Sequence, residues 1–410
     1  MSLVLLSARD RAAPRRVGLR SPRRAPCRTG LVRALLAAAA LMLLPGPGAG
    51  AEEACWAPES FRHSERDLPI RTGIAAARVA LPTDEPAPPP QSFRPVDGVV
   101  RRVDLPPGAP KMIALTFDLC ETPFEVAGYQ GASVDTLRAN GVRATFFAGG
   151  KWMLTHPDRA GQIATDPLFE IASHAWEHRN FRIVTGRPML DEIRGPQSAY
   201  QRLRDGLAAR QCAPRPGRDL AAAMPERLGL FRFPFGACNR AAIEAVGAAG
   251  LIPVQWDVSS GDPDRHLSSA AMVSSVLRRV RPGSIVLFHA NGRGWATDEA
   301  LPEIVARLRQ QGYVFVTVGE LLAYPGAKPV VAASCYDETP GDTDRYDGLA
   351  RLLDGRSALF AARTAAPAGD RGPAGAVSPA PSRSARVAKP ALPARPALPA
   401  AVGPLPVGQP

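Results

Sequence analysis

The stretch KMIALTFDLCETP, residues 111–123, decides the interpretation of the fold. Its apolar run at residues 112–117 has the composition of a buried strand, and the run ends at an aspartate, Asp118. Strands that are apolar on both faces are typical of parallel sheets covered by helices. A carboxylate at the carboxyl end of such a strand indicates metal or acid/base chemistry, because the reactive groups of β/α barrels lie there.

Six further apolar runs and several helical patterns follow the first run along the chain. Alternation of strands with amphipathic helices predicts an α/β fold with a parallel sheet. About seven strands within residues 109–325 favour a distorted (β/α) barrel over a doubly wound open sheet, and no GxGxxG or GxxxxGK[ST] motif follows any run. The expected strands are residues 112–117, 143–148, 168–173, 230–235, 251–258, 284–289 and 313–318, and the expected helices are residues 131–140, 188–208, 239–249, 267–280 and 298–311.

The net charge of +12 comes from the two ends of the chain. Residues 1–51 contain nine arginines and one acidic residue, and residues 361–410 contain six basic residues and one acidic residue. Residues 52–360 are close to neutral, with 35 basic and 36 acidic residues. The part of the chain that is expected to fold therefore lacks the basic surface of a nucleic-acid-binding protein, and we expect no nucleic-acid partner.

The N-terminal segment has the pattern of an export signal. Arginines precede an unbroken apolar core at residues 34–44, which is about half the length that spans a bilayer, and small residues follow at 49–51. We therefore predict a signal peptide at residues 1–51, no membrane span, and a periplasmic or secreted protein. Five cysteines remain after cleavage, and in an oxidising compartment disulfides are expected among them.

Composition divides the rest of the exported chain. Residues 52–108 are rich in proline and are predicted to form an irregular N-terminal extension or linker, and residues 326–360 form a C-terminal extension. Residues 361–410 repeat alanine, proline and arginine, a composition that cannot bury a core and predicts a disordered tail. Residues 109–325 remain as the folded domain.

Polar residues that could bind a metal or act in catalysis lie at the ends of five expected strands. His174 and His178 are four residues apart, so on one helical turn both imidazoles point the same way and can bind one cation. Two imidazoles would take a carboxylate as third ligand and leave positions open for water and substrate. The complete set is Asp118, His174 and His178 in SHAWEH, Arg232 in FRFPFG, Asp262 in WDVSSGD and His289 in LFHANG.

The five segments TFDLCE, SHAWEH, RFPFG, WDVSSGD and LFH, in this order, resemble the motifs of the polysaccharide deacetylases, the NodB-homology or carbohydrate esterase family 4 enzymes. The resemblance covers residues 108–325. It implies a distorted (β/α) barrel with one divalent metal ion, zinc or cobalt, that hydrolyses the N-acetyl group of an amino sugar in a polymer.

The resemblance also assigns roles to four polar residues. Asp118 matches the general base that takes a proton from the attacking water, and Arg232 matches the arginine that orients this base and lowers its pKa. His289 matches the general acid that protonates the departing amine. Asp262 matches the aspartate that holds this histidine in its charged form.

Further residues are assigned to the metal and the substrate by the same resemblance. His174 and His178 match the two metal-binding histidines. Leu287 is expected to line the pocket that receives the acetyl methyl group, and Trp176 and Phe235, which lie within the motifs, are expected to contact the substrate.

The sequence departs from the family pattern directly after Asp118. The family has a second aspartate there as the third metal ligand, whereas this chain has Leu119, which cannot bind a metal. Glu121 could reach back from the loop, Asp118 could itself bind the metal, or Cys120 could do so as a thiolate. We favour Glu121 or Asp118, with Glu121 as the assigned ligand, because a disulfide with Cys238, another motif cysteine, better explains Cys120 in an exported protein. That disulfide would clamp two active-site loops.

The sequence thus predicts a metal-dependent deacetylase acting on a chitin-like polymer, peptidoglycan or exopolysaccharide. Two alternatives remain open: a metal-independent hydrolase of small-molecule amides on the same fold, which Leu119 would permit, and a catalytically inactive carbohydrate-binding module.

Overall fold

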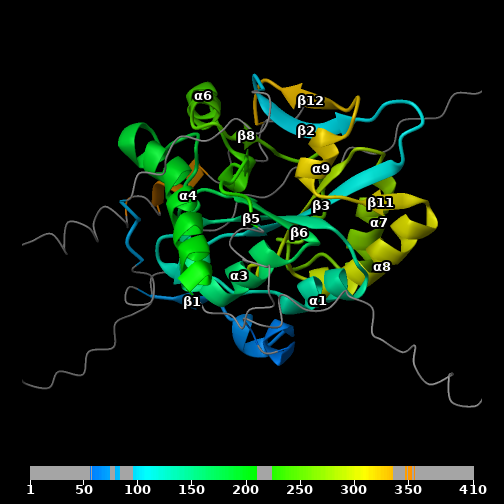
Figure 1. Cartoon of the computed structure of the whole chain (residues 1–410), viewed down its shortest axis with the longest axis horizontal. Coiled ribbons are helices and arrows are strands. Elements are labelled where there is room, and N and C mark those ends of the chain that lie inside the picture. Colours follow the sequence, from blue (N-terminus) through cyan, green and yellow to red (C-terminus); the bar gives the residue numbers. More distant parts are fainter. Residues whose placement is uncertain are drawn as a thin grey trace, which may run out of the picture. The chain divides into compact units, whose positions relative to one another are not determined.

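A computed structural model describes residues 56, 58–73, 79–83, 96–209, 224–335, 347–348, 350–352 and 355 (Figure 1). The expected signal peptide at 1–51 and the expected tail at 361–410 lie outside the described residues. Among the helices that are described, none combines the length and the hydropathy that crossing a bilayer requires.

Seven parallel strands curl into a half-barrel, which confirms the predicted α/β fold. Their spatial order is β8-β7-β6-β5-β3-β10-β9, and β11 (Tyr313–Phe315) pairs in parallel with the first residues of β3. The strands are β3 (Lys111–Leu119), β5 (Ala144–Ala148), β6 (Phe169–Ser173), β7 (Leu230–Phe231), β8 (Ile252–Pro253), β9 (Val258–Ser259) and β10 (Ile285–His289).

Strand β3 lies at the centre of this sheet, between β5 and β10. All of its residues except Lys111 are buried, and Phe117 stacks on Phe146 and on Phe288 of the neighbouring strands, with 5.3 Å between ring centroids in each pair. These rings occupy one face of the sheet, and stacked aromatic side chains of this size contribute strongly to core stability. The apolar run at residues 112–117 thus forms most of the central strand of the sheet.

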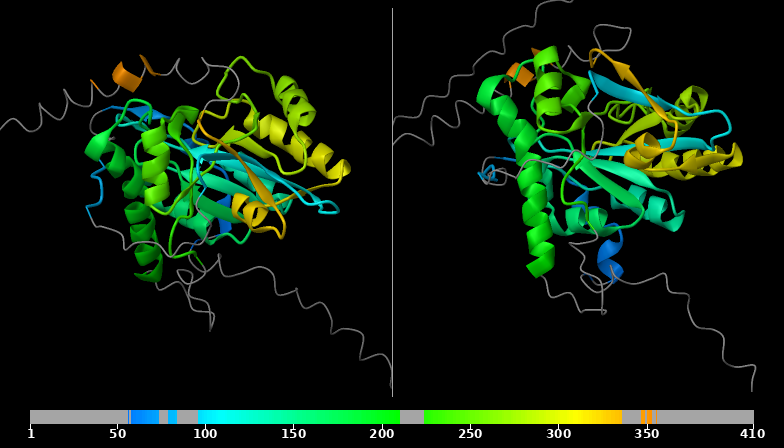
Figure 2. Two further views of the ribbon diagram at one scale, coloured as in Figure 1. Left: turned by 90° about the horizontal axis from the view of Figure 1, so that it is seen from above. Right: turned by 45° about the horizontal axis from the view of Figure 1, so that its top comes forward.

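Helices cover the strands, with α4 on one side and α7 and α8 on the other (Figures 1 and 2). The five predicted helices are confirmed, and α2, α3 and α9 are additional. Thr317 begins α9 with a capping box to Glu320, which ends the strand predicted at 313–318 early. The helices are α1 (Gly131–Ala139), α2 (Gly150–Thr155), α3 (Pro157–Thr165), α4 (Gly186–Ala209), α6 (Arg240–Ala248), α7 (Ser269–Arg279), α8 (Thr297–Gln310) and α9 (Val318–Ala323).

The single strand predicted at 251–258 is wrong, because the chain changes partners within it. Strand β8 pairs with β7, whereas β9 pairs with β10. Between them, the Gln255 amide donates to the carbonyl oxygen of Val100, and Asp257 donates to Ile285. Pro253, which has no N–H to donate, ends β8.

An antiparallel pair of strands, β2 (Val99–Asp104) and β12 (Lys328–Ala332), lies beside the parallel sheet. Isolated bridges link β2 to Val254 and to Ser284, so β2 spans the side of the half-barrel where β8 and β9 part. The prediction of irregular chain up to residue 108 is therefore wrong for β2. The sequence missed it because its partner lies more than 200 residues away.

The segment at 58–73 also packs on the domain. Its short helices η2 (Pro58–Phe61) and η3 (Glu65–Asp67) precede β1 (Arg71–Thr72), which pairs antiparallel with β4 (Glu125–Val126) in the loop after β3. The carbonyl oxygen of Asp67 accepts a hydrogen bond from the Tyr129 amide. This segment therefore contacts the loop that follows Asp118.

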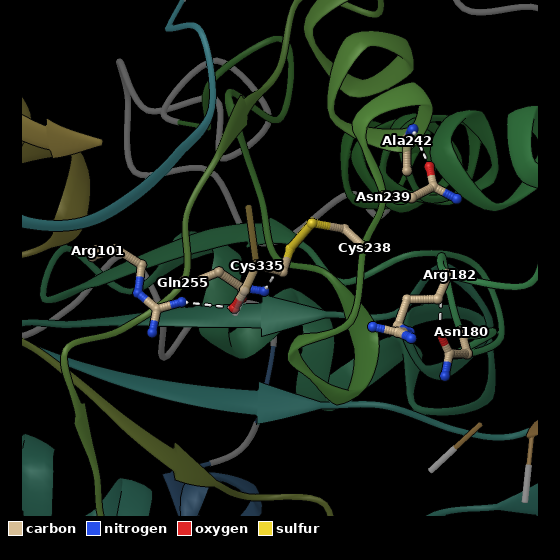
Figure 3. Close-up of a disulfide and its surroundings, with 8 residues drawn as sticks. All are labelled: Arg101, Asn180, Arg182, Cys238, Asn239, Ala242, Gln255 and Cys335. Atoms are coloured by element: carbon tan, nitrogen blue, oxygen red, sulfur yellow. Dashed lines mark hydrogen bonds between the residues drawn. A yellow bond between two sulfur atoms is a disulfide. The ribbon is translucent and has the colours of Figure 1, made fainter. Parts of the chain in front are cut away.

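The structure contains a disulfide between Cys238 and Cys335 (Figure 3), whereas Cys120 is a buried free thiol. The predicted Cys120–Cys238 disulfide is therefore wrong. The sulfur of Cys238 is bonded to Cys335 and is therefore not available to Cys120. Cys335 follows β12, and its carbonyl oxygen accepts a hydrogen bond of 2.9 Å from Arg101 of β2.

Candidate active site

The carboxyl ends of β3, β6 and β10 bring the predicted polar residues to one edge of the sheet. Asp118 and His289 are direct register partners on the adjacent strands β3 and β10. His174 immediately follows β6, and its amide donates to Ala148 at the end of β5. Parallel topology explains this convergence, since the corresponding ends of all strands point the same way.

Asp118 is held by a fully buried arginine. One Asp118 oxygen, Oδ1, accepts a hydrogen bond of 2.9 Å from Nη1 of Arg232, which is 0% exposed. The guanidinium also donates to Thr116 and to the carbonyl oxygen of Gln255, so its position is fixed from several sides. Burial alone would raise the pKa of Asp118, but the charges of His174 and His289, when these are protonated, and the permanent charge of Arg232 hold that pKa below its ordinary value. Asp118 is therefore ionised.

His174 and His178 present nitrogen atoms that lack hydrogen-bond partners. His174 donates from Nδ1 to the carbonyl oxygen of Arg232 over 2.9 Å, which leaves Nε2 as a bare lone pair. His174 Nε2 and His178 Nδ1 are both buried without a hydrogen-bond partner. Burial lowers the pKa of both imidazoles, so both are neutral. Neutral imidazoles with free lone pairs are the form that binds metal ions.

The loop that carries the two histidines has an unusual backbone. Ala175 and His178 both have left-handed φ values, 63° and 62°, which are costly for residues other than glycine. Glu192 of α4, which is buried, compensates by accepting hydrogen bonds at Oε2 from the amides of Trp176, Glu177 and Arg179. Sequence reasoning missed Glu192, because only the fold brings α4 against this loop.

His289 is paired with a buried carboxylate. Its Nδ1 donates to Oδ1 of Asp262 over 2.9 Å, and its backbone amide donates to Oδ2 over 2.7 Å. The Thr297 hydroxyl donates to the same Oδ2, so the carboxylate cannot rotate freely. Burial lowers the pKa of His289, but the Asp262 charge outweighs it and leaves the pKa above its ordinary value. His289 can therefore carry a proton on Nε2 near neutral pH.

Cys120 joins the histidine pair. In the described part of the chain, Cys120, His174 and His178 form the one group of at least three His, Cys, Asp or Glu side chains whose ligand atoms all lie within 4.8 Å of one another. Asn291 donates from Nδ2 to the Cys120 sulfur over 3.1 Å and to its carbonyl oxygen over 3.0 Å. The alternation of side chains along a strand could have indicated Cys120 as a ligand, because residues 118 and 120 point to the same face if the extended chain continues past Asp118.

Glu121 lies on the other side of the loop, which corrects its assignment as the third metal ligand. Its Oε1 accepts hydrogen bonds from the Ala127 amide and from the Thr155 hydroxyl of α2, over 3.0 and 2.6 Å. Its Oε2 lies 4.0 Å from Nζ of Lys151, also on α2. Burial raises the pKa of Glu121 to about 7. Glu121 therefore ties the loop to α2 and faces away from the histidines.

The three residues expected to contact substrate occupy different environments. Trp176 is only 5% exposed and packs against Gly150 and Gly195 in the core, which corrects its assignment as a sugar-contacting residue. Phe235, at a left-handed φ of 59°, is half-buried, and its ring centroid lies 4.3 Å from that of His178. Leu287 is buried on β10, two residues before His289, so the two side chains share one face.

Comparison with known proteins agrees with this geometry. The sequence profile of the polysaccharide deacetylase family matches residues 106–254, which include Asp118, His174, His178 and Arg232. This part of the chain is therefore similar to polysaccharide deacetylases. The match ends before Asp262 and His289, so these two residues of the site lie outside the matched segment.

Several deacetylases are similar to this chain. The peptidoglycan-N-acetylglucosamine deacetylase PgdA of Listeria monocytogenes is 27% identical over 229 residues, which are 56% of this chain and 42% of that protein. A peptidoglycan-N-acetylglucosamine deacetylase of Bacillus cereus is 28% identical over 220 residues, which are 53% of this chain and 91% of that protein. The chain thus spans less than half the length of the Listeria relative. A crystal structure of a CE4 family pseudoenzyme from Bacillus anthracis is 24% identical, with a TM-score of 0.42, and covers 55% of this chain and 69% of that one.

Proposed function

We propose that this protein is a metal-dependent hydrolase that removes N-acetyl groups from an amino-sugar polysaccharide. One observation carries the proposal: Asp118, held by Arg232, and His289, held by Asp262, are register partners on adjacent strands, beside two histidines that each have a buried ring nitrogen without a hydrogen-bond partner. A base and an acid whose pKa values are moved apart by their partners are what hydrolysis of an amide needs.

The histidines fit a divalent metal ion. His174 and His178 offer neutral nitrogen atoms that make no hydrogen bond, the chemistry that zinc prefers and that cobalt(II) also accepts. We infer that these two residues would hold the ion, zinc in the first place. When bound, the ion supplies Lewis acidity that polarises the acyl oxygen and lowers the pKa of the attacking water.

Asp118 would act as the general base. Its Oδ1 is engaged by Arg232, so Oδ2, which lies 3.4 Å from His174 Nε2, is the oxygen free to accept a proton from the attacking water. The buried Arg232 charge keeps Asp118 ionised before the attack and fixes its orientation. The water oxygen then forms a bond to the amide carbon while Asp118 takes the proton.

His289 would act as the general acid. Asp262 holds its Nδ1–H, which leaves the Nε2–H to be donated to the amide nitrogen as the carbon–nitrogen bond breaks. The products are the free amine of the sugar and acetic acid, which loses its proton to solvent as acetate. Asp118 then holds one proton more than at the start and His289 holds one fewer, and proton exchange with solvent restores both groups.

The acyl group and the polymer would be recognised by residues around this pair. Leu287, buried beneath His289, would contact the acetyl methyl group, and Phe235 would contact the sugar beside His178. Peptidoglycan is the first polymer to test, because the names of the similar Listeria and Bacillus cereus proteins specify it. A polymer of the cell wall also agrees with the predicted export to the periplasm or the exterior.

Acetate release tests the proposal. Purified protein, stripped with a chelator and reloaded with zinc or cobalt, is incubated with peptidoglycan, chitin oligosaccharides and an N-acetylated exopolysaccharide. We expect metal-dependent acetate release from at least one polymer and its loss in Asp118→Ala. Equal release by stripped and reloaded protein would refute the metal dependence, and absence of release from every polymer would refute the deacetylase function.

A further inference from the structure

The side chains after Asp118 alternate in direction. β3 ends at Leu119, and continued alternation would place Asp118 and Cys120 on one face and Leu119 and Glu121 on the other, which agrees with the contacts of these residues. Leu119 is 0% exposed in the main hydrophobic core, and Glu121 bonds to α2. Cys120 is therefore the first residue after Asp118 that is directed toward the histidine pair.

The cysteine sulfur is within reach of both free nitrogens. The ligand atoms of Cys120, His174 and His178 lie within 4.8 Å of one another. A tetrahedral ion with bonds of about 2.0–2.3 Å separates its ligands by roughly 3.5 Å, so a contraction of about 1 Å would complete the site. His174 Nε2, on a side chain that is 1% exposed, and His178 Nδ1 have no hydrogen-bond partner that would compete with an ion.

No carboxylate in the described residues fills this position. Glu121 accepts hydrogen bonds from Ala127 and Thr155 and is turned away. Asp118 bonds to Arg232 and does not belong to the group of ligand atoms around the histidines. The thiol of Cys120 is also not consumed by a disulfide, since Cys238 pairs with Cys335.

The surroundings of Cys120 are built to keep its sulfur in place. Asn291 donates one amide hydrogen bond to the sulfur and another to the carbonyl oxygen of the same residue. Lys151 donates to the carbonyl oxygens of Thr122 and Glu125, which fixes the loop that follows. An N–H donor to sulfur is the kind of outer contact that orients and stabilises a thiolate ligand.

We propose that Cys120 is the third protein ligand of the metal ion, as a thiolate, so that the site is Cys120–His174–His178 rather than a carboxylate with two histidines. This inference rests on the metal dependence proposed above. A ligand set of one sulfur and two nitrogens favours zinc, cobalt(II) and softer ions over magnesium, calcium or manganese, which prefer oxygen ligands. Leu119 cannot serve as the third ligand, and in this proposal the next residue, Cys120, takes that role on the side of the chain that also carries Asp118.

Cobalt(II) spectroscopy tests the ligand directly. The full chain is stripped of metal and titrated with cobalt(II) chloride without oxygen, and its absorption spectrum is recorded. We expect a thiolate-to-cobalt charge-transfer band in the near ultraviolet that saturates at one ion per chain. A protein that binds one cobalt(II) ion without this band would overturn the proposal. Failure to bind any cobalt would overturn both the ligand assignment and the metal dependence.

Three variants test whether Cys120 gives rise to the charge-transfer band. Cys120→Ser should lose it and bind cobalt at least about tenfold more weakly, since even outer contacts to a metal site contribute 10–100-fold. Cys120→Asp should retain cobalt without the band, and Glu121→Gln, the matched control, should keep both. A band that persists in Cys120→Ser would assign it to another cysteine and refute the proposal. If Cys120→Ser does not fold, as judged by circular dichroism, the wild-type and Cys120→Asp spectra decide.

The outcome is separable from the proposed reaction. A chain that shows the thiolate band but releases no acetate would refute the deacetylase function and leave the ligand assignment intact. A chain that binds cobalt without the band but releases acetate would refute the ligand assignment and leave the deacetylase function intact.

Discussion

Replacing Asp262 with asparagine tests whether His289 is the general acid. The carboxylate lies 2.9 Å from Nδ1 of the imidazole and accepts two further hydrogen bonds, from the His289 amide and from Thr297. Asparagine has the same shape but no charge, and its NH₂ group would face donors where an oxygen accepted them. The substitution therefore removes the charge that keeps His289 protonated while leaving the burial that opposes protonation.

The size of the effect follows from the charge separation. Two unit charges about 4 Å apart interact by about 4 kcal/mol at an effective dielectric constant near 20, and one pKa unit corresponds to about 1.4 kcal/mol. The loss of Asp262 should therefore lower the pKa of His289 by about 1–3 units. Because the wild-type pKa is raised above its ordinary value, activity that needs protonated His289 is present below that pKa and is lost as pH rises through it. In Asp262→Asn the alkaline limb should move to lower pH by a similar amount.

The assay is acetate release measured as kcat/KM between pH 5 and 10. Thr297→Val is the matched control, because it removes a neutral donor to Asp262 and keeps the charge, so its alkaline limb should not move to lower pH. An Asp262→Asn variant whose alkaline limb coincides with that of the wild type would show that another group donates the proton.

Three further predictions concern the base, the histidine loop and the disulfide. Asp118→Asn should lower kcat by about 10² or more while cobalt(II) binding, followed by absorption, is retained; near-normal turnover would identify another base. Glu192→Ala removes the acceptor of three loop amides and should weaken cobalt binding by about 10–100-fold, with a smaller loss in Glu192→Gln; unchanged affinity in both would show that the loop is held by other contacts. Cys335→Ser should lower the free energy of unfolding by about 2–4 kcal/mol in urea titrations, and an unchanged midpoint would refute a stabilising disulfide with Cys238.

The sequence predicted the central sheet and most of the polar cluster, for a physical reason. Buried parallel strands appear as uninterrupted apolar runs, and their parallel arrangement carries whatever follows each run to the same edge. Asp118, His174 and His289 could therefore be grouped before any contact was known. The long helices at 186–209 and 297–310 were equally visible from their periodicity.

The errors came from properties that local sequence does not contain. From sequence alone a disulfide with Cys238 accounts for Cys120 and favours Glu121 as the ligand. In the structure Cys120 is a free thiol beside the histidines, and Glu121 bonds to Ala127 and Thr155. The partner of Cys238 depends on where β12 lies, and cysteine spacing alone does not determine connectivity. Trp176 lies within a motif, yet its packing against Gly150 depends on α2, which the sequence did not predict.

The way residues 58–73 and β2 pack bears on how the domain can be cut from the chain. The family match begins at residue 106, but a fragment that started there would lack β1, which pairs with the loop after Asp118, and β2, which bridges Val254 and Ser284. It would also lose the partner of β12 and the Arg101 contact to Cys335. A recombinant fragment that keeps these supports begins no later than Pro58 and extends beyond Cys335, so it is longer at both ends than the segment that the family match covers.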